Sequence, residues 1–144
     1  MIYLPDTNAF SAYLAGRSKP LSDRMTAAFA AGELRLSVMV ISELEFGAEK
    51  ARAALGETKF VRRVAALRRQ IEVEGIGAEF PRFYARVRTH LEAAGRKIGD
   101  RDTIIAAHAL SLGATLVTAN MDEFSRVPGL AVENWEPTAA SSPL

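Results

Sequence analysis

Short apolar runs alternate along the chain with longer segments whose apolar residues recur at helical spacing. Four runs have the length and composition of buried strands, namely residues 1–4, 34–40, 114–118 and 130–133. Strands that alternate with helices favour an α/β fold with a parallel sheet, in which a ligand site lies at the carboxyl ends of the strands.

The helical segments are bounded by residues that commonly start or end helices. We expect helices over residues 7–15, 21–31, 60–71, 80–91 and 100–112, with a further helical segment from residue 41 that follows the second strand directly. Gly113 stands where a helix-ending glycine is expected. In 60–71 the apolar residues form one stripe and the basic residues lie off it, which is typical of an amphipathic helix.

The composition is that of one ordinary globular domain. The chain has 144 residues, 49% of them hydrophobic and 24% charged, and we expect a domain over residues 1–136 with a flexible tail over 137–144. The absence of cysteine excludes disulfides, zinc–thiolate sites, iron–sulfur clusters and thiol nucleophiles. No apolar stretch is long enough to span a membrane and no signal peptide is recognisable, so we expect a cytoplasmic protein.

Charge is divided unevenly along the chain although the net charge is only +1. Residues 50–101 hold 13 of the 18 Lys and Arg residues against 6 acids, which leaves +7 in the middle and −6 elsewhere. Solvated helix faces often produce such runs. A basic centre beside acidic ends also suits a protein that attracts a polyanion to a site built from carboxylates.

Acidic and amide side chains follow the predicted strands or start the predicted helices. Asp6 follows the first strand, Glu43 follows the second, Asp102 lies in the first turn of a helix, and Asn120 and Asp122 follow the strand at 114–118. Because the carboxyl ends of parallel strands share one edge of a sheet, we expect these side chains to converge. Taken singly, Asp6 and Asp102 are equally well explained as helix caps.

Converging carboxylates repel one another unless a cation lies between them. Oxygen ligands select hard cations such as Mg²⁺ or Mn²⁺, and the chemistry that such a site supports best is phosphoryl transfer. Both histidines are interpreted as structural: His108 lies in an apolar helix, and His90 has no matching catalytic partner.

Four segments, taken together and in this order, resemble the PIN-domain family, and most closely its VapC-type toxin ribonucleases of toxin–antitoxin pairs. They are YLPDTN at 3–8, ISELEFGA at 41–48, IGDRDTIIAAHA at 98–109 and VTANMDEF at 117–124. The resemblance spans about residues 2–135 and implies a three-layer α/β/α PIN-like fold, with a short central parallel sheet flanked by helices. Pro5 departs from the pattern, in which an apolar residue precedes the aspartate.

The resemblance implies a metal-dependent endoribonuclease in which Asp6, Glu43 and Asp102 are catalytic carboxylates. They hold Mg²⁺ or Mn²⁺, and Asn120 or Asp122 completes the metal shell. Asn120 stands where an acid is also common, and its neutral carbonyl lowers the charge of the cluster, which weakens occupancy of a second metal. The expected products carry a 5′-phosphate and a 3′-hydroxyl.

The same resemblance implies an RNA substrate, a VapB-like antitoxin that inhibits the enzyme by binding a groove between helices, and a homodimer. Six arginines are candidates for steering the RNA backbone: Arg62, Arg63, Arg69, Arg82, Arg86 and Arg101.

Three other functions compete with this one. A dehalogenase-like phosphatase needs a second aspartate where Asn8 stands, and a receiver domain needs an acidic pair after the first strand and a late lysine. A catalytically weak PIN domain that acts as an RNA- or protein-binding module is the main alternative, because Asn120 replaces an acid.

Overall fold

Short parallel strands form the centre of the computed structural model, which describes residues 1–137. They are β1 (Tyr3–Pro5), β2 (Leu36–Ser37), β3 (Val73–Glu74), β4 (Thr115–Val117) and β5 (Val132–Glu133). β4 pairs with β1 and β5, β2 pairs with β3, and a parallel bridge from Tyr3 to Leu34 joins the two groups. Since every pairing is parallel, the carboxyl ends of the strands lie along one edge.

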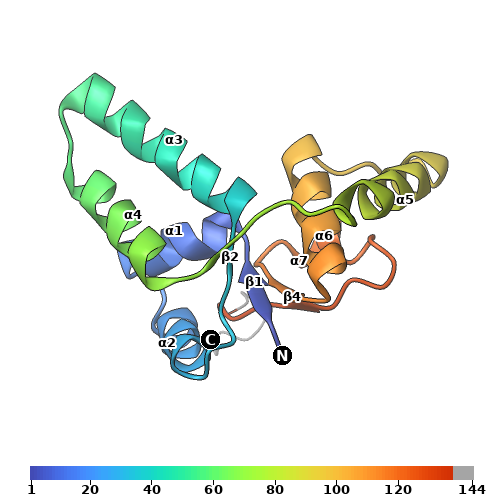
Figure 1. The fold of residues 1–144 in the computed structure, drawn as a ribbon, viewed down its shortest axis with the longest axis horizontal. Helices are drawn as coiled ribbons and strands as arrows, with labels where there is room; N and C mark the ends of the chain where they lie inside the picture. Colours follow the sequence, from blue (N-terminus) through green and yellow to red (C-terminus); the bar gives the residue numbers. More distant parts are fainter. Residues whose placement is uncertain (138–144) are drawn as a thin grey trace, which may run out of the picture.

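Helices cover the strands on both sides (Figure 1). They are α1 (Thr7–Ala15), α2 (Lys19–Ala30), α3 (Val38–Leu55), α4 (Lys59–Gln70), α5 (Phe80–Ala93), α6 (Asp100–Leu112) and α7 (Met121–Phe124). The α3–α4 pair and the α5–α6 pair extend to opposite sides of the strands, and each pair packs together. The expected three-layer α/β/α architecture is confirmed. Among the helices described, none is long and apolar enough to cross a membrane.

The core lies where the strands meet these helices. Leu4, Leu36 and Leu116 are fully buried on three strands, and Phe10 and Phe124 are buried on α1 and α7. Burial of a side chain of this size contributes roughly 1.5–3 kcal/mol. The strands that precede the acidic residues are therefore anchored in the buried core.

The second strand is shorter than the sequence predicts, and the helix after it starts earlier. An apolar, β-branched run covers residues 34–40, yet only Leu36–Ser37 is a strand and α3 begins at Val38. Ser37 causes the change, because its side-chain oxygen caps the helix by accepting a hydrogen bond from Met39 N at 3.2 Å. Glu43 consequently lies in the second turn of α3, so the expectation that it stands at a helix start is wrong.

β3 is a strand that no pattern in the sequence predicts. Val73 pairs with Leu36 and Glu74 with Ser37, in parallel register. Two residues are too few to produce a strand-like alternation. Of the expected tail over 137–144, all but Pro137 lies outside the described residues.

Candidate active site

Two neighbouring strands bring Asp6 and the segment around Thr118 together. Pro5 at the end of β1 pairs with Val117 at the end of β4, and Asp6 N donates to the carbonyl of Val117 at 2.9 Å. Asp6 therefore leaves one strand directly beside the residue that leaves the other, as the strand-end argument predicts.

Asp6 is held rigidly as it enters α1. Its Oδ1 accepts a hydrogen bond from Ala9 N at 2.8 Å, and its carboxyl is also hydrogen-bonded to the side chain of Thr118. Only 6% of the residue is exposed. Burial raises the pKa of Asp6, the bonds from Thr118 and Ala9 oppose the rise, and the charge of Glu136 adds to it. Asp6 is thus a helix cap. Capping orients its carboxyl and is compatible with a second role for Asp6 in a metal site.

Asp102 lies in the first turn of α6 and faces two other acids. Burial, a hydrogen bond to Glu123 and the negative charges of Glu123 and Asp6 together raise the pKa of Asp102 to about 6, and burial has the largest effect. Gly99, and not Asp102, is the N-cap of α6. The cap interpretation of Asp102 is therefore wrong. Its carboxyl belongs instead to a group of acids, with Glu123 and Asp6, that repel one another.

Glu123 belongs to this group although the sequence analysis does not single it out. It lies on α7, the short helix that follows β4, where Asn120 Nδ2 donates to its Oε2 at 3.0 Å. Asn120 N in turn donates to Thr118 Oγ1 at 2.9 Å. The available signal was the spacing: Glu123 stands three residues after Asn120, on the same face of a helical turn.

Glu43 lies on α3 and is paired with a cation of the chain itself. Its Oε2 lies 3.1 Å from Arg101 Nη1, with 25% of the glutamate side chain and 73% of the arginine side chain exposed. Arg101 directly precedes Asp102 on α6. Glu43 is thus linked to the start of α6 by charge.

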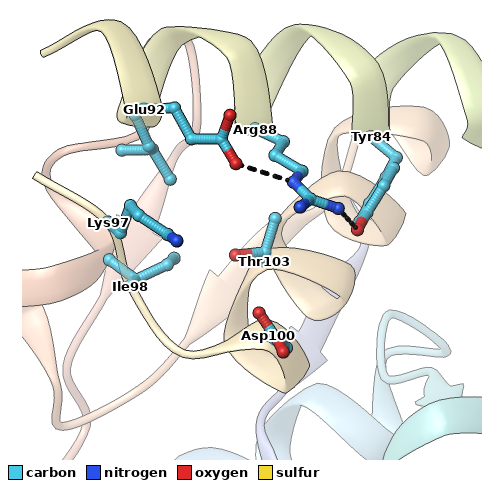
Figure 2. Close-up of a pocket in the computed structure, with 8 residues that line it drawn as sticks. Tyr84, Arg88, Glu92, Lys97, Ile98, Asp100 and Thr103 are labelled. Carbon is cyan, nitrogen blue, oxygen red and sulfur yellow. Dashed lines mark hydrogen bonds and ion pairs between the residues drawn. The ribbon is translucent and has the colours of Figure 1, made fainter. Parts of the chain in front are cut away.

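Asp122 and Asp100 are placed less centrally. Asp122 is exposed on α7, where Ser125 Oγ donates to its backbone carbonyl, and its role as a metal ligand stays a prediction. Asp100 is the first residue of α6 and lines a cavity of about 20 Å³ beneath α5, roughly the space of one water molecule. In Figure 2, Arg88 lies above this cavity between Glu92 and Tyr84.

The oxygen atoms of the acidic side chains are suitable ligands for a hard divalent cation, but the side chains are not arranged closely around one point. Asp6, Asp102 and Glu123 supply only oxygens, and their mutual repulsion is what a cation relieves. Within residues 1–137, however, no three acidic or imidazole side chains are gathered closely enough to hold a metal ion. Glu43 is paired with Arg101 and Glu123 with Asn120, so ion binding requires these side chains to exchange partners.

His108 has the structural role expected of it. It is fully buried, its Nδ1 lies 2.8 Å from Ser37 Oγ, and its Nε2 lies 3.0 Å from the carbonyl oxygen of Gly75. A carbonyl only accepts, so Nε2 carries the proton and the serine hydroxyl donates to Nδ1. Burial lowers the pKa of His108, which favours this neutral form and joins α6 to β2 and to the segment before α5.

Comparison with known proteins shows similarity over nearly the whole chain. Residues 3–130 match the family model of the PIN domain. Ribonuclease VapC2 of Rickettsia felis is 30% identical over 136 residues, covering 94% of this chain and 99% of that protein. The tRNA(fMet)-specific endonuclease VapC of Shigella flexneri is 32% identical over 119 residues, covering 83% of this chain and 88% of that protein.

Solved structures agree with the sequence comparison. VapBC2 of Rickettsia felis, bound to a DNA fragment from its promoter, contains a chain with a TM-score of 0.86 and 29% identity, covering 94% of this chain and 100% of that one. VapBC-1 of nontypeable Haemophilus influenzae gives a TM-score of 0.80 at 30% identity, covering 94% and 98%. The chain belongs to the PIN domain family and, within it, to the VapC ribonucleases.

Proposed function

We propose that the protein is a metal-dependent endoribonuclease of the toxin type that hydrolyses RNA phosphodiester bonds. The observation that carries the proposal is the gathering of Asp6, Asp102 and Glu123 from three elements at one edge of the sheet, where Glu123 and Asp6 act on the Asp102 carboxyl. Clustered carboxylates repel one another unless a bound cation compensates their charge, and such a cation can in turn bind an anionic substrate.

Asp6, Glu43 and Asp102 are the proposed catalytic carboxylates, and Glu123 joins them on the strength of its contact with Asp102. Bound Mg²⁺ or Mn²⁺ lowers the pKa of water and neutralises charge on the phosphate. Thr118 and the backbone N–H of Ala9 fix the orientation of Asp6. We keep Asp122 and the carbonyl oxygen of Asn120 as proposed further ligands.

Asn120 has a second proposed role, as the residue that positions Glu123. Its side-chain amide donates to the Glu123 carboxylate while its backbone N–H donates to Thr118. An aspartate at this place would repel Glu123 instead. The neutral Asn120 therefore suits this cluster, because Glu123 supplies the negative charge that an acid at position 120 would otherwise provide.

Substrate and partner are inferred from the relatives and from charge. Two relatives are called a ribonuclease and a tRNA(fMet)-specific endonuclease, and the similar structures are VapBC complexes. We infer an RNA substrate cut to leave a 5′-phosphate and a 3′-hydroxyl, a VapB-like antitoxin that inhibits the enzyme, a homodimer and a cytoplasmic location. Most of the basic residues lie in the middle of the chain, where they suit contacts to an RNA backbone.

Cleavage of a mixed RNA pool by protein freed of antitoxin tests the proposal. We expect cutting with Mg²⁺ or Mn²⁺, none with chelator, and loss of cutting in Asp6→Ala and Asp102→Asn variants that keep the wild-type circular dichroism. Asp23→Asn is the matched control, because Asp23 is an exposed acid on α2 paired with Lys19. Wild-type protein that binds RNA without metal-dependent cutting would favour the binding-module alternative.

A further inference from the structure

Arg101 directly precedes Asp102, and it is paired with one of the proposed catalytic carboxylates, Glu43. It lies between Asp100 and Asp102 in the first turn of α6, and its guanidinium is 3.1 Å from the Glu43 carboxylate on α3.

The pair opposes metal binding at Glu43. A carboxylate that is already paired with a guanidinium offers little net charge to a divalent cation, and the two cations repel each other at close range. An exposed ion pair of this kind is worth only about 0–1 kcal/mol, so breaking it costs little. Arg101 has room to leave, because 73% of its side chain is exposed.

A phosphodiester is the partner that suits Arg101 once it leaves. The guanidinium presents donors in a planar fork that matches two phosphate oxygens. Because Arg101 directly precedes Asp102 on α6, we expect it to lie close to the backbone of an RNA that reaches these acids. A phosphate that attracts Arg101 also frees Glu43 for a metal ion.

We propose that Arg101 is a positioning residue that pairs with Glu43 in the free protein and transfers to an RNA phosphate in the complex. The inference rests on the proposed function and adds that RNA binding and metal binding are coupled through Arg101. RNA and divalent cation then strengthen each other's binding, because binding free energies are linked reciprocally. The ion pair keeps metal occupancy low until RNA arrives.

Two binding measurements test the exchange, neither of which depends on cleavage. Calorimetric titration with Mn²⁺ compares wild type, Arg101→Gln and the control Arg96→Gln, which removes an exposed arginine from the loop before α6. We expect Arg101→Gln to bind Mn²⁺ about twofold to fivefold more tightly, the range that an exposed ion pair allows, and Arg96→Gln to bind like wild type. In a Glu43→Gln background, Arg101→Gln should have no effect.

The second measurement is the anisotropy of a labelled single-stranded RNA in chelator, at several salt concentrations. Loss of one phosphate contact should weaken binding in Arg101→Gln and reduce the slope of log affinity against log salt by about 0.7. Circular dichroism confirms that each variant is folded.

Each result decides the matter. Unchanged Mn²⁺ affinity in Arg101→Gln, equal tightening in Arg96→Gln, or an unchanged salt slope would overturn the exchange. Failure of Mn²⁺ to bind either protein would refute the metal site and this inference with it. If both binding changes occur but wild-type protein cuts no RNA, the proposed activity fails and the exchange of Arg101 stands.

Discussion

Asp102→Asn should stabilise the metal-free protein while abolishing its activity. In the free protein burial, and after it the neighbouring Glu123 and Asp6, raise the pKa of Asp102 from 3.8 to about 6. Asparagine has nearly the same shape, carries no charge, and offers an amide donor to Glu123. The substitution therefore removes an electrostatic cost without leaving a cavity.

The magnitude follows from the pKa. A rise from 3.8 to about 6 corresponds to a ceiling of about 3 kcal/mol, because one pKa unit equals about 1.4 kcal/mol. Asp102 is only partly buried, so solvent screening reduces the gain to about 1–2 kcal/mol. For a domain of this size the gain raises Tm by about 3–8 °C.

The sign depends on pH. The folded protein holds the Asp102 proton more tightly than the unfolded chain does, so wild type loses stability as pH rises from about 4 to about 6. Above that window the carboxylate is ionised in both states and the full cost remains. The variant should therefore exceed wild type in stability at pH 7.5 and match it at pH 3.5.

Urea unfolding in chelator at these two pH values measures the difference. Asp23→Asn serves as the control and should lose no more than about 0.5 kcal/mol at either pH, since it removes an exposed pair with Lys19. A variant that is less stable than wild type at pH 7.5, or a gain that does not change with pH, would refute the electrostatic reasoning.

Three further substitutions separate structural roles from functional ones. Ser37→Ala leaves His108 Nδ1 without a donor and should cost about 1–3 kcal/mol in urea unfolding; an unchanged midpoint would show that the pair contributes nothing. Gly113→Ala forces alanine into a φ of 64° and should cost about 1 kcal/mol, and a Tm equal to wild type would contradict this. Asn120→Ala frees Glu123, so RNA cleavage should fall several-fold with little change in Tm; full activity would exclude the positioning role.

Local patterns predicted most of the elements because their signals lie next to one another in the sequence. The helix expected over residues 7–15 has those bounds in the structure, with Asp6 capping its start and Gly16 ending it at a φ of 67°. The helix that begins near Asp100 likewise ends before Gly113. Caps and left-handed glycines act within a few residues, so no tertiary contact is needed to place them.

The candidate site was predictable in part, since the carboxyl ends of parallel strands share one edge, where Asp6 and the residues after β4 lie. Glu123 was missed because its role depends on the turn that α7 makes after Asn120, a feature of only four helical residues. Glu43 was placed at a helix start because the apolar run at 34–40 hid the cap at Ser37. The pairing of Glu43 with Arg101 depends on the packing of two helices that are distant in sequence, and no local pattern reports it.

Diffraction from crystals grown with Mn²⁺, recorded at a wavelength where manganese scatters anomalously, tests the central claim most directly. We predict an anomalous peak in contact with carboxylate oxygens of Asp6 and Asp102, with Glu43 turned from Arg101 toward the ion. No peak between these acids, or a peak bound only to other side chains, would contradict the account.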